Sequence, residues 1–253
     1  MRRRLAAWVS TAIVLSLSAP SVFQQATAAM LPVVADAELR ENINADSGNN
    51  GTSINARYNN NDRNEWIALK FDLSSIADKS LVADVALHTV MHRSNSNNTK
   101  NLALYALSPG TTGEDWDESS ITYGAMPGFT FDMDSTTNVL DVGGAVVDLG
   151  SFNVTGVETK GDVAVIDPAS LTSLVQGMGA NDLLTILIST ASATNGQWRI
   201  ASKEATSLDG GDPTGDAGDF AAFLEVNVVP EPTAASLAWL ACVVLVAARR
   251  RRF

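Results

Sequence analysis

The amino-acid sequence predicts an all-β domain of the sandwich or barrel class, flanked by two terminal segments of different character. From 33 to 229 the chain consists of short apolar runs separated by Gly, Asn, Asp, Ser and Thr, which is typical of many short strands joined by turns. Only one stretch of this region has helical spacing. Long apolar runs beside arginine clusters occur only at the two ends, which indicates targeting segments rather than core.

The clearest predicted strand covers 66–73, where Ile67, Leu69 and Phe71 share one face and alternate with residues of the other face. The run 183–188 is apolar at nearly every position, as expected of a central sandwich strand. Further strands are expected at 81–92, 102–107, 139–142, 145–149, 162–166, 183–190, 197–202 and 220–229.

One short helix is predicted over 167–176, where it would cap one end of the sandwich. Asp167 stands at the expected N-cap and Pro168 at the first helical position. Two glycines follow the segment and end it. The apolar stripe of this helix has i, i+3, i+4 spacing and consists of Leu171, Leu174 and Val175.

The charge of the 253-residue chain is uneven. The whole chain has 28 acidic and 17 basic residues, a net charge of −11, but seven of the basic residues lie at the two ends. The stretch 29–229 keeps ten basic and 27 acidic residues, a net charge of −17. This balance argues against nucleic acid and anionic membrane surfaces as partners. The single cysteine, Cys242, excludes a disulfide framework and any multi-cysteine metal site.

Residues 1–29 predict a secretory signal. Arg2, Arg3 and Arg4 precede an apolar stretch, and 26–28 read Ala-Thr-Ala, a small-x-small site for signal peptidase. An uncleaved anchor is the alternative, but the apolar run is short for a bilayer span and ends at Pro20. The body of the protein is therefore expected to begin at residue 30 and to end at residue 229.

Residues 230–253 combine a Pro-Glu-Pro motif, one apolar run over 234–248, an arginine cluster and an immediate chain end. This combination resembles the PEP-CTERM sorting tail, which implies recognition by an exosortase-type enzyme in a Gram-negative bacterium rich in exopolysaccharide. The apolar run would form a short transient span of the inner membrane, with the arginines on the cytoplasmic side. An ordinary membrane anchor predicts the same topology but does not account for the motif. The expected sorting residues are Pro230, Glu231, Pro232, Arg249, Arg250, Arg251 and Arg252.

The body carries a second resemblance. It opens with Ala-Asp-Ala-Glu at 35–38, continues with Trp-Asp-Glu-Ser-Ser-Ile-Thr-Tyr at 116–123 and nearby Pro127, and closes with Ala-Ser-Lys-Glu at 201–204. In order and spacing it resembles the DNRLRE-type surface domain, which is related to family 96 carbohydrate-binding modules. The resemblance implies a jelly-roll β-sandwich, secretion and non-catalytic binding, often of polysaccharide.

A structural calcium ion follows from the same resemblance, since jelly-roll binding modules often hold one between the first strand and the segment before the last. The implied ligands are Asp36, Glu38 and Asp219. The acidic loop 209–219 also offers oxygen ligands of the kind calcium needs. Its spacing matches neither the EF-hand loop nor the nonapeptide repeat, so a solvated acidic loop remains the alternative.

Sugar-binding platforms are aromatic, and the candidate ligand-binding residues are Tyr58, Trp66 and Trp198. Each could instead serve packing or stand in a loop. Trp116 and Tyr123 belong to the family pattern and are expected in the core.

Catalytic motifs are weak. Asp132, Asp134 and Thr136 match the D-x-D-x-T phosphatase motif, but that chemistry needs a parallel α/β fold, so a polar loop is the better interpretation. His88 and His92 would lie about 13 Å apart on a strand, too far for a shared metal, and are expected to face solvent. We therefore expect no enzyme. The predicted function is an exported surface or matrix protein that binds polysaccharide, or alternatively a structural, adhesive protein without a glycan ligand.

Overall fold

The computed structural model describes residues 27–41, 47–49, 51–57, 64–93, 99–130, 139–155, 157, 159–191 and 197–229. These residues belong to one compact unit, Ala26–Glu231. The sorting tail 230–253 and residues 1–26 of the predicted signal lie outside the described residues. Residues 27–29 of the predicted signal form the start of the first strand.

The described part of the chain is mostly strand, with one α-helix, α1 (Ala169–Gly177), and one 3-10 turn, η1 (Lys79–Leu81). The strands are β1 (Thr27–Arg40), β2 (Ser47–Asn49), β3 (Ser53–Arg57), β4 (Glu65–Asp72), β5 (Val82–Val90), β6 (Thr99–Leu107), β7 (Phe129–Thr130), β8 (Val139–Leu140), β9 (Val146–Thr155), β10 (Val163–Ile166), β11 (Leu183–Thr190), β12 (Gln197–Ala201) and β13 (Phe223–Val228).

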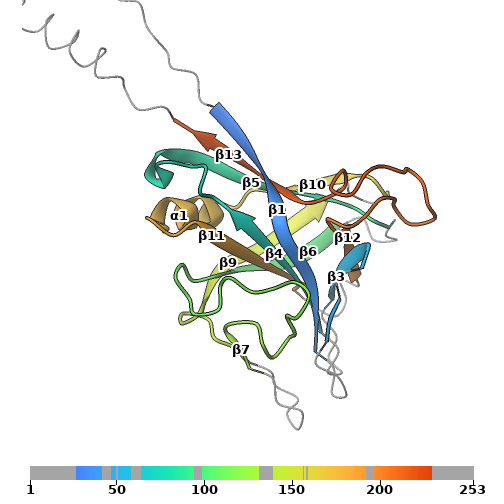
Figure 1. Cartoon of the computed structure of the whole chain (residues 1–253), viewed down its shortest axis with the longest axis horizontal. Coiled ribbons are helices and arrows are strands. Elements are labelled where there is room, and N and C mark those ends of the chain that lie inside the picture. The colour runs from blue at the N-terminus through green and yellow to red at the C-terminus, as the bar shows by residue number, and fades with distance from the viewer. Residues whose placement is uncertain are drawn as a thin grey trace, which may run out of the picture. The chain divides into compact units, whose positions relative to one another are not determined.

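Strand β1 belongs to both layers of the fold. Its first half pairs with β13 and its second half with β4, and the register shifts between Val33 and Ala35. Such an irregularity bends a strand and lets it pass from one layer to the other. The antiparallel order β10-β5-β13-β1-β4-β11-β6-β9 therefore forms a nearly closed sheet, in which β1 runs beside β13 and then beside β4 (Figure 1). The predicted all-β class is confirmed.

Two apolar clusters cover opposite faces of β4. Ile67, Leu69 and Phe71 are fully buried between the layers. Ala68 is also fully buried, because the segment after β6 covers the outer face with a second cluster. That cluster includes Trp116 and Tyr123, so the prediction that these aromatic residues pack in the core is confirmed.

Helix α1 covers the strand edges that the sheet leaves open. Thr172 Oγ1 accepts from Val85 N at 3.0 Å, and Gln176 Nε2 donates to the Val82 carbonyl at 2.7 Å. These positions of β5 lie outside its pairing with β10. The predicted N-cap at Asp167 is wrong: Pro168 has extended backbone (φ −66°, ψ 137°) and is the cap, with no side-chain hydrogen bond.

Several strand boundaries differ from the sequence prediction, among them the ends of β9 and β5. Strand β9, predicted to end at 149, continues to Thr155, because Gly150 (φ 95°) still pairs with β6 across a shift in register. Strand β5 ends at Val90, and the chain then bridges Met91 to β12. The strand alternation stops there, so His92 is buried and the expectation that it faces solvent is wrong.

Candidate functional site

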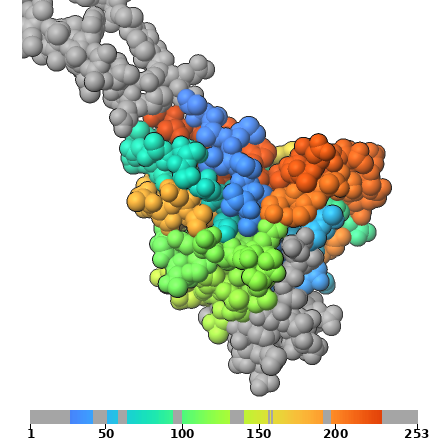
Figure 2. Space-filling view, in the orientation of Figure 1, coloured from blue at the N-terminus to red at the C-terminus, as the bar shows by residue number. Residues whose placement is uncertain are grey.

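Three carboxylates from distant parts of the chain meet beside β1. Asp36 lies on β1, Glu118 lies in the segment that covers the sheet, and Glu204 follows β12. One oxygen from each lies within 4.8 Å of those of the other two. We call this group, Asp36, Glu118 and Glu204, the acid centre. Figure 2 shows the segment after β12, in orange, packed beside β1, in blue.

Local structure places each carboxylate. Asp36 pairs with Leu69 of β4 and is fully buried. Glu118 lies in a turn in which Asp117 accepts from the Ser119 backbone N at 2.8 Å. Such an aspartate-led turn is a common local structure for this residue. A turn of the backbone from Ser202 to Ala205 holds Glu204 next to β12, and Lys203 N donates to Asp36 Oδ2 at 2.7 Å.

One ammonium neutralises part of this charge. Lys203 Nζ lies 2.9 Å from Glu118 Oε2 and 2.6 Å from Glu204 Oε1. The other oxygen of Asp36, Oδ1, is buried and has no hydrogen-bond partner. Buried polar atoms are nearly always paired. The acid centre therefore has an excess of negative charge. Its oxygen Asp36 Oδ1 is free to coordinate a cation.

Burial and the neighbouring charges shift the pKa values of all three carboxyl groups. Burial raises the pKa of Asp36 to about 7; the Lys203 backbone N–H opposes the rise, and the charges of Glu204 and Glu118 add to it. Burial also raises the pKa of Glu118. Burial acts in the same direction on Glu204, but hydrogen bonds from Lys203 and Glu118 outweigh it and lower the pKa of Glu204.

The donor set suits a hard divalent cation. Carboxylate oxygens are the ligands that calcium and magnesium prefer. Calcium binds oxygens at about 2.3–2.6 Å, so oxygens on opposite sides of the ion are roughly 5 Å apart, comparable with the 4.8 Å spread of the acid centre. Three carboxylates leave positions for water or backbone oxygen, which calcium accepts. Asp36, Glu118 and Glu204 could therefore hold a calcium ion.

Glu38, which was predicted as a calcium ligand, belongs to a different network. It is fully buried, and its Oε2 accepts from Asn55 N at 2.9 Å and from Asn55 Nδ2 at 2.6 Å. Its Oε1 accepts from Arg40 Nε. Arg199 Nε in turn donates to Asn55 Oδ1 at 2.6 Å. This network joins β1, β3 and β12 with protein donors alone.

Asp219, the third predicted ligand, is exposed and accepts from Asp216 N at 2.8 Å. Elsewhere in the acidic loop, Asp209 lies 3.5 Å from Arg93 Nε and its carbonyl accepts from Lys160 Nζ. Within the described residues, the acid centre is the one group of three metal-ligating side chains. The structure thus brings together one of the three predicted ligands with two glutamates that sequence reasoning missed.

Glu118 and Glu204 could have been found from the sequence, because both lie in motifs that carry the family resemblance. Glu118 lies in the 116–123 motif and Glu204 in the 201–204 motif, while Asp36 lies in the opening motif 35–38. All three carboxylates therefore occur in the motifs that carry the family resemblance.

The predicted sugar-binding aromatic residues differ in position. Trp198 is fully buried in the core, so its ring offers no face to a sugar. Trp66 is half-buried, with its ring 5.2 Å from Phe129 and 5.7 Å from Tyr105, and the Trp66 and Tyr105 rings are tilted by 50°. Tyr58 lies outside the described residues.

The two histidines of the chain have different surroundings. His88 stacks on Phe223 at 4.4 Å, and its Nε2 lies 3.2 Å from Glu225. Burial lowers the pKa of His92. The motif residues Asp132, Asp134 and Thr136 lie outside the described residues.

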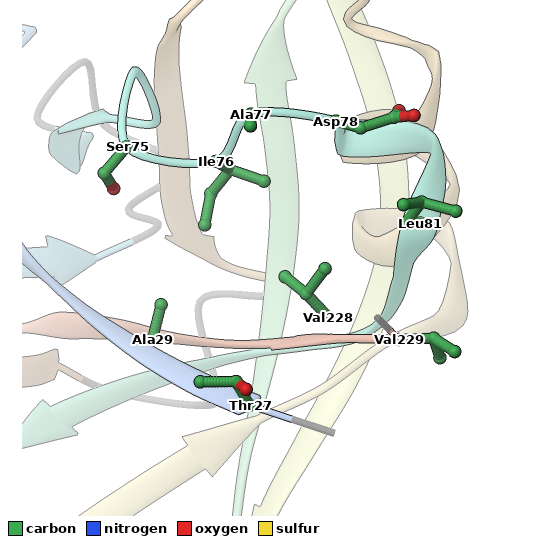
Figure 3. Close-up of a pocket in the computed structure, with 9 residues that line it drawn as sticks. All are labelled: Thr27, Ala29, Ser75, Ile76, Ala77, Asp78, Leu81, Val228 and Val229. Carbon is green, nitrogen blue, oxygen red and sulfur yellow. The ribbon is translucent and has the colours of Figure 1, made fainter. Parts of the chain in front are cut away.

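A mostly apolar pocket of about 350 Å³ lies beside the start of β1 and the end of β13. In Figure 3, Ile76 and Val228 point toward one another across it, whereas the carboxylate of Asp78 points away. Asp78 accepts from Ser80 N at 2.9 Å and caps η1. The lining residues are Thr27, Ala29, Ser75, Ile76, Ala77, Asp78, Leu81, Val228 and Val229.

Comparison with known proteins gives no further assignment: no family model matches the chain, and no curated protein matches it significantly. Within the described ranges, no helix is both long and apolar enough to cross a membrane. The apolar run 234–248 lies outside those ranges.

Proposed function

We propose that this chain is an exported cell-surface or extracellular-matrix protein whose jelly-roll β-sandwich has a structural or adhesive role and is clamped by a calcium ion at the acid centre. The observation that carries the calcium part of the proposal is the buried Asp36 with its unpartnered Oδ1, next to two more carboxylates. A calcium ion there would link β1, the covering segment and the segment after β12.

The terminal segments support export. The signal-like start and the Pro-Glu-Pro tail together fit a path through signal peptidase, a transient inner-membrane span and an exosortase-type enzyme. To test it, full-length chains carrying Pro230→Ala, Glu231→Ala and Pro232→Ala would be followed by cell fractionation. We expect these variants to remain in the inner membrane, whereas the parent chain reaches the surface. Equal surface release of both would contradict the sorting proposal.

A non-catalytic role fits the packing of the aromatic residues. Trp198 is buried in the core and Trp66 is packed against two other rings, so the described candidates leave little open ring surface for a flat sugar platform. Self-association of the purified protein with calcium, without binding to polysaccharide, is the expected outcome.

Polysaccharide binding is the second candidate, favoured by the half-buried pair of Trp66 and Tyr105 on one face of the sheet. Pull-down with neutral and acidic exopolysaccharides distinguishes the two functions. Binding that Trp66→Ala abolishes would establish the glycan ligand and displace the adhesive role.

Calcium at the acid centre is tested by thermal unfolding with calcium and with a chelator. We expect calcium to raise the Tm, because a ligand that binds only the native state stabilises it. Identical Tm values in the two conditions would remove the ion from the proposal.

A further inference from the structure

We propose that Lys203 is an exchangeable counter-ion: its ammonium neutralises the acid centre when calcium is absent, and calcium enters only by displacing it. This inference rests on the calcium site proposed above and concerns how that site is regulated.

The ammonium and the ion would compete for the same oxygens. Lys203 Nζ is hydrogen-bonded to both Glu118 and Glu204, and these glutamates are two of the three carboxylates available to a cation. A calcium ion coordinated by the same side chains would lie within a few ångströms of the ammonium. Two like charges at that distance in a partly buried site repel strongly, so simultaneous occupancy is unfavourable.

Lys203 can leave without unfolding the site. Its side chain is 30% exposed, which gives the ammonium a path to solvent. Its backbone N–H separately holds Asp36 Oδ2 at 2.7 Å. The backbone can therefore keep Asp36 in place while the flexible side chain moves away.

Exchange also improves the charge balance. Three carboxylates with one ammonium leave a net charge of −2 when all three are ionised, whereas a divalent ion reduces it to −1. Asp36 Oδ1, which has no hydrogen-bond partner beside the ammonium, would become a ligand of the ion. The cost of releasing Lys203 lowers the apparent affinity for calcium. The lysine thus sets the calcium concentration at which the centre is filled.

The decisive experiment compares calcium binding by the full-length chain in detergent, measured by calorimetry, for the parent, Lys203→Met and Lys160→Met. Lys160 is a matched control because its ammonium donates to a backbone carbonyl, that of Asp209. We expect Lys203→Met to bind calcium about tenfold more tightly or better, since a competing positive charge is gone. Lys160→Met should bind like the parent.

The outcomes separate the two proposals. Tighter binding by Lys203→Met, or binding by that variant alone, supports exchange. Equal or weaker binding by Lys203→Met overturns exchange and leaves the calcium site intact. No binding by either protein overturns the calcium site itself.

A measurement on the parent chain covers the case in which Lys203→Met does not fold. Amine acetylation followed by peptide mass spectrometry reports how accessible each lysine is. Calcium should increase the labelling of Lys203 several-fold, because its ammonium loses two carboxylate partners, and should leave Lys160 unchanged. Unchanged or reduced labelling of Lys203 at saturating calcium would overturn the exchange.

Discussion

Two fully buried carboxylates two residues apart on β1 have opposite surroundings. Glu38 receives hydrogen bonds from Arg40 and from two groups of Asn55. Asp36 receives one backbone hydrogen bond, and its second oxygen has no partner. Burial raises the pKa of both. Burial of a carboxylate therefore does not by itself indicate a metal site. The better indication is a buried carboxylate oxygen that accepts no hydrogen bond, as in Asp36.

The largest expected effect is the contribution of Asp36 to the pH dependence of stability, measured in the presence of a chelator. A folded-state pKa of about 7, above the ordinary value of 3.8, means that the native state holds the proton more tightly than the unfolded state. This contribution to stability is therefore lost as the pH rises from about 4 to 7. Relative to Asp36→Asn, the parent should lose roughly 4 kcal/mol of unfolding free energy over this range, of the order given by a three-unit shift. Urea unfolding at several pH values measures it, and a constant difference would contradict it.

A second, slightly smaller effect is expected from Glu38→Ala. Removing this carboxylate leaves the buried Asn55 N–H without its acceptor and Arg40 without its partner, at a cost of about 3 kcal/mol. The loss should be the same with calcium and with chelator, because Glu38 needs no ion. Glu225→Ala, at a partly exposed position, is the control with little effect. Loss of the calcium response in Glu38→Ala would show instead that Glu38 is a ligand.

Calcium should stabilise the parent by about 2.7 kcal/mol at a hundredfold excess over Kd. Glu118→Gln and Glu204→Gln should lose most of this gain, since an amide is a weaker ligand for a hard cation than a carboxylate. Differential scanning calorimetry with and without calcium measures the gain. Glu225→Gln serves as the control and should respond like the parent. A full calcium response in both acid-centre variants would place the ion elsewhere.

The smallest effect is expected from Asn55→Ala, which removes the Nδ2 donor to Glu38 but keeps the backbone N–H of residue 55, and should cost about 1 kcal/mol. With fewer donors the pKa of Glu38 should rise further, so stability should fall more steeply as the pH rises through the acidic range. Gln197→Ala, next to the same network through Arg199, is the control. A pH profile identical to that of the parent would show that Asn55 contributes little to holding the charge of Glu38.

Much of the secondary structure was predictable because its signals are local. The run 183–190 is strand β11 as expected, and α1 lies within three residues of its prediction at either end. The differences arise where tertiary contacts override local signals. The strand predicted over 145–149 continues to Thr155, because Gly150, whose φ is 95°, still pairs with Leu104 of β6. Residues 27–40 were not expected as one long strand, because only pairing with both β13 and β4 makes them one.

The sequence by itself determined the all-β class, the single short helix and the acidic character of the body, because alternation, turn residues and charge are properties of neighbouring residues. Only the tertiary structure decided which carboxylates meet. Asp36, Glu118 and Glu204 are far apart in the chain, and the pairing of β1 with β4 and the fold of two loops bring them together. The same pairing surrounds Glu38 with donors. Whether a buried carboxylate has hydrogen-bond donors depends on atoms of other strands and loops. The sequence around the carboxylate does not reveal which of these atoms lie near it.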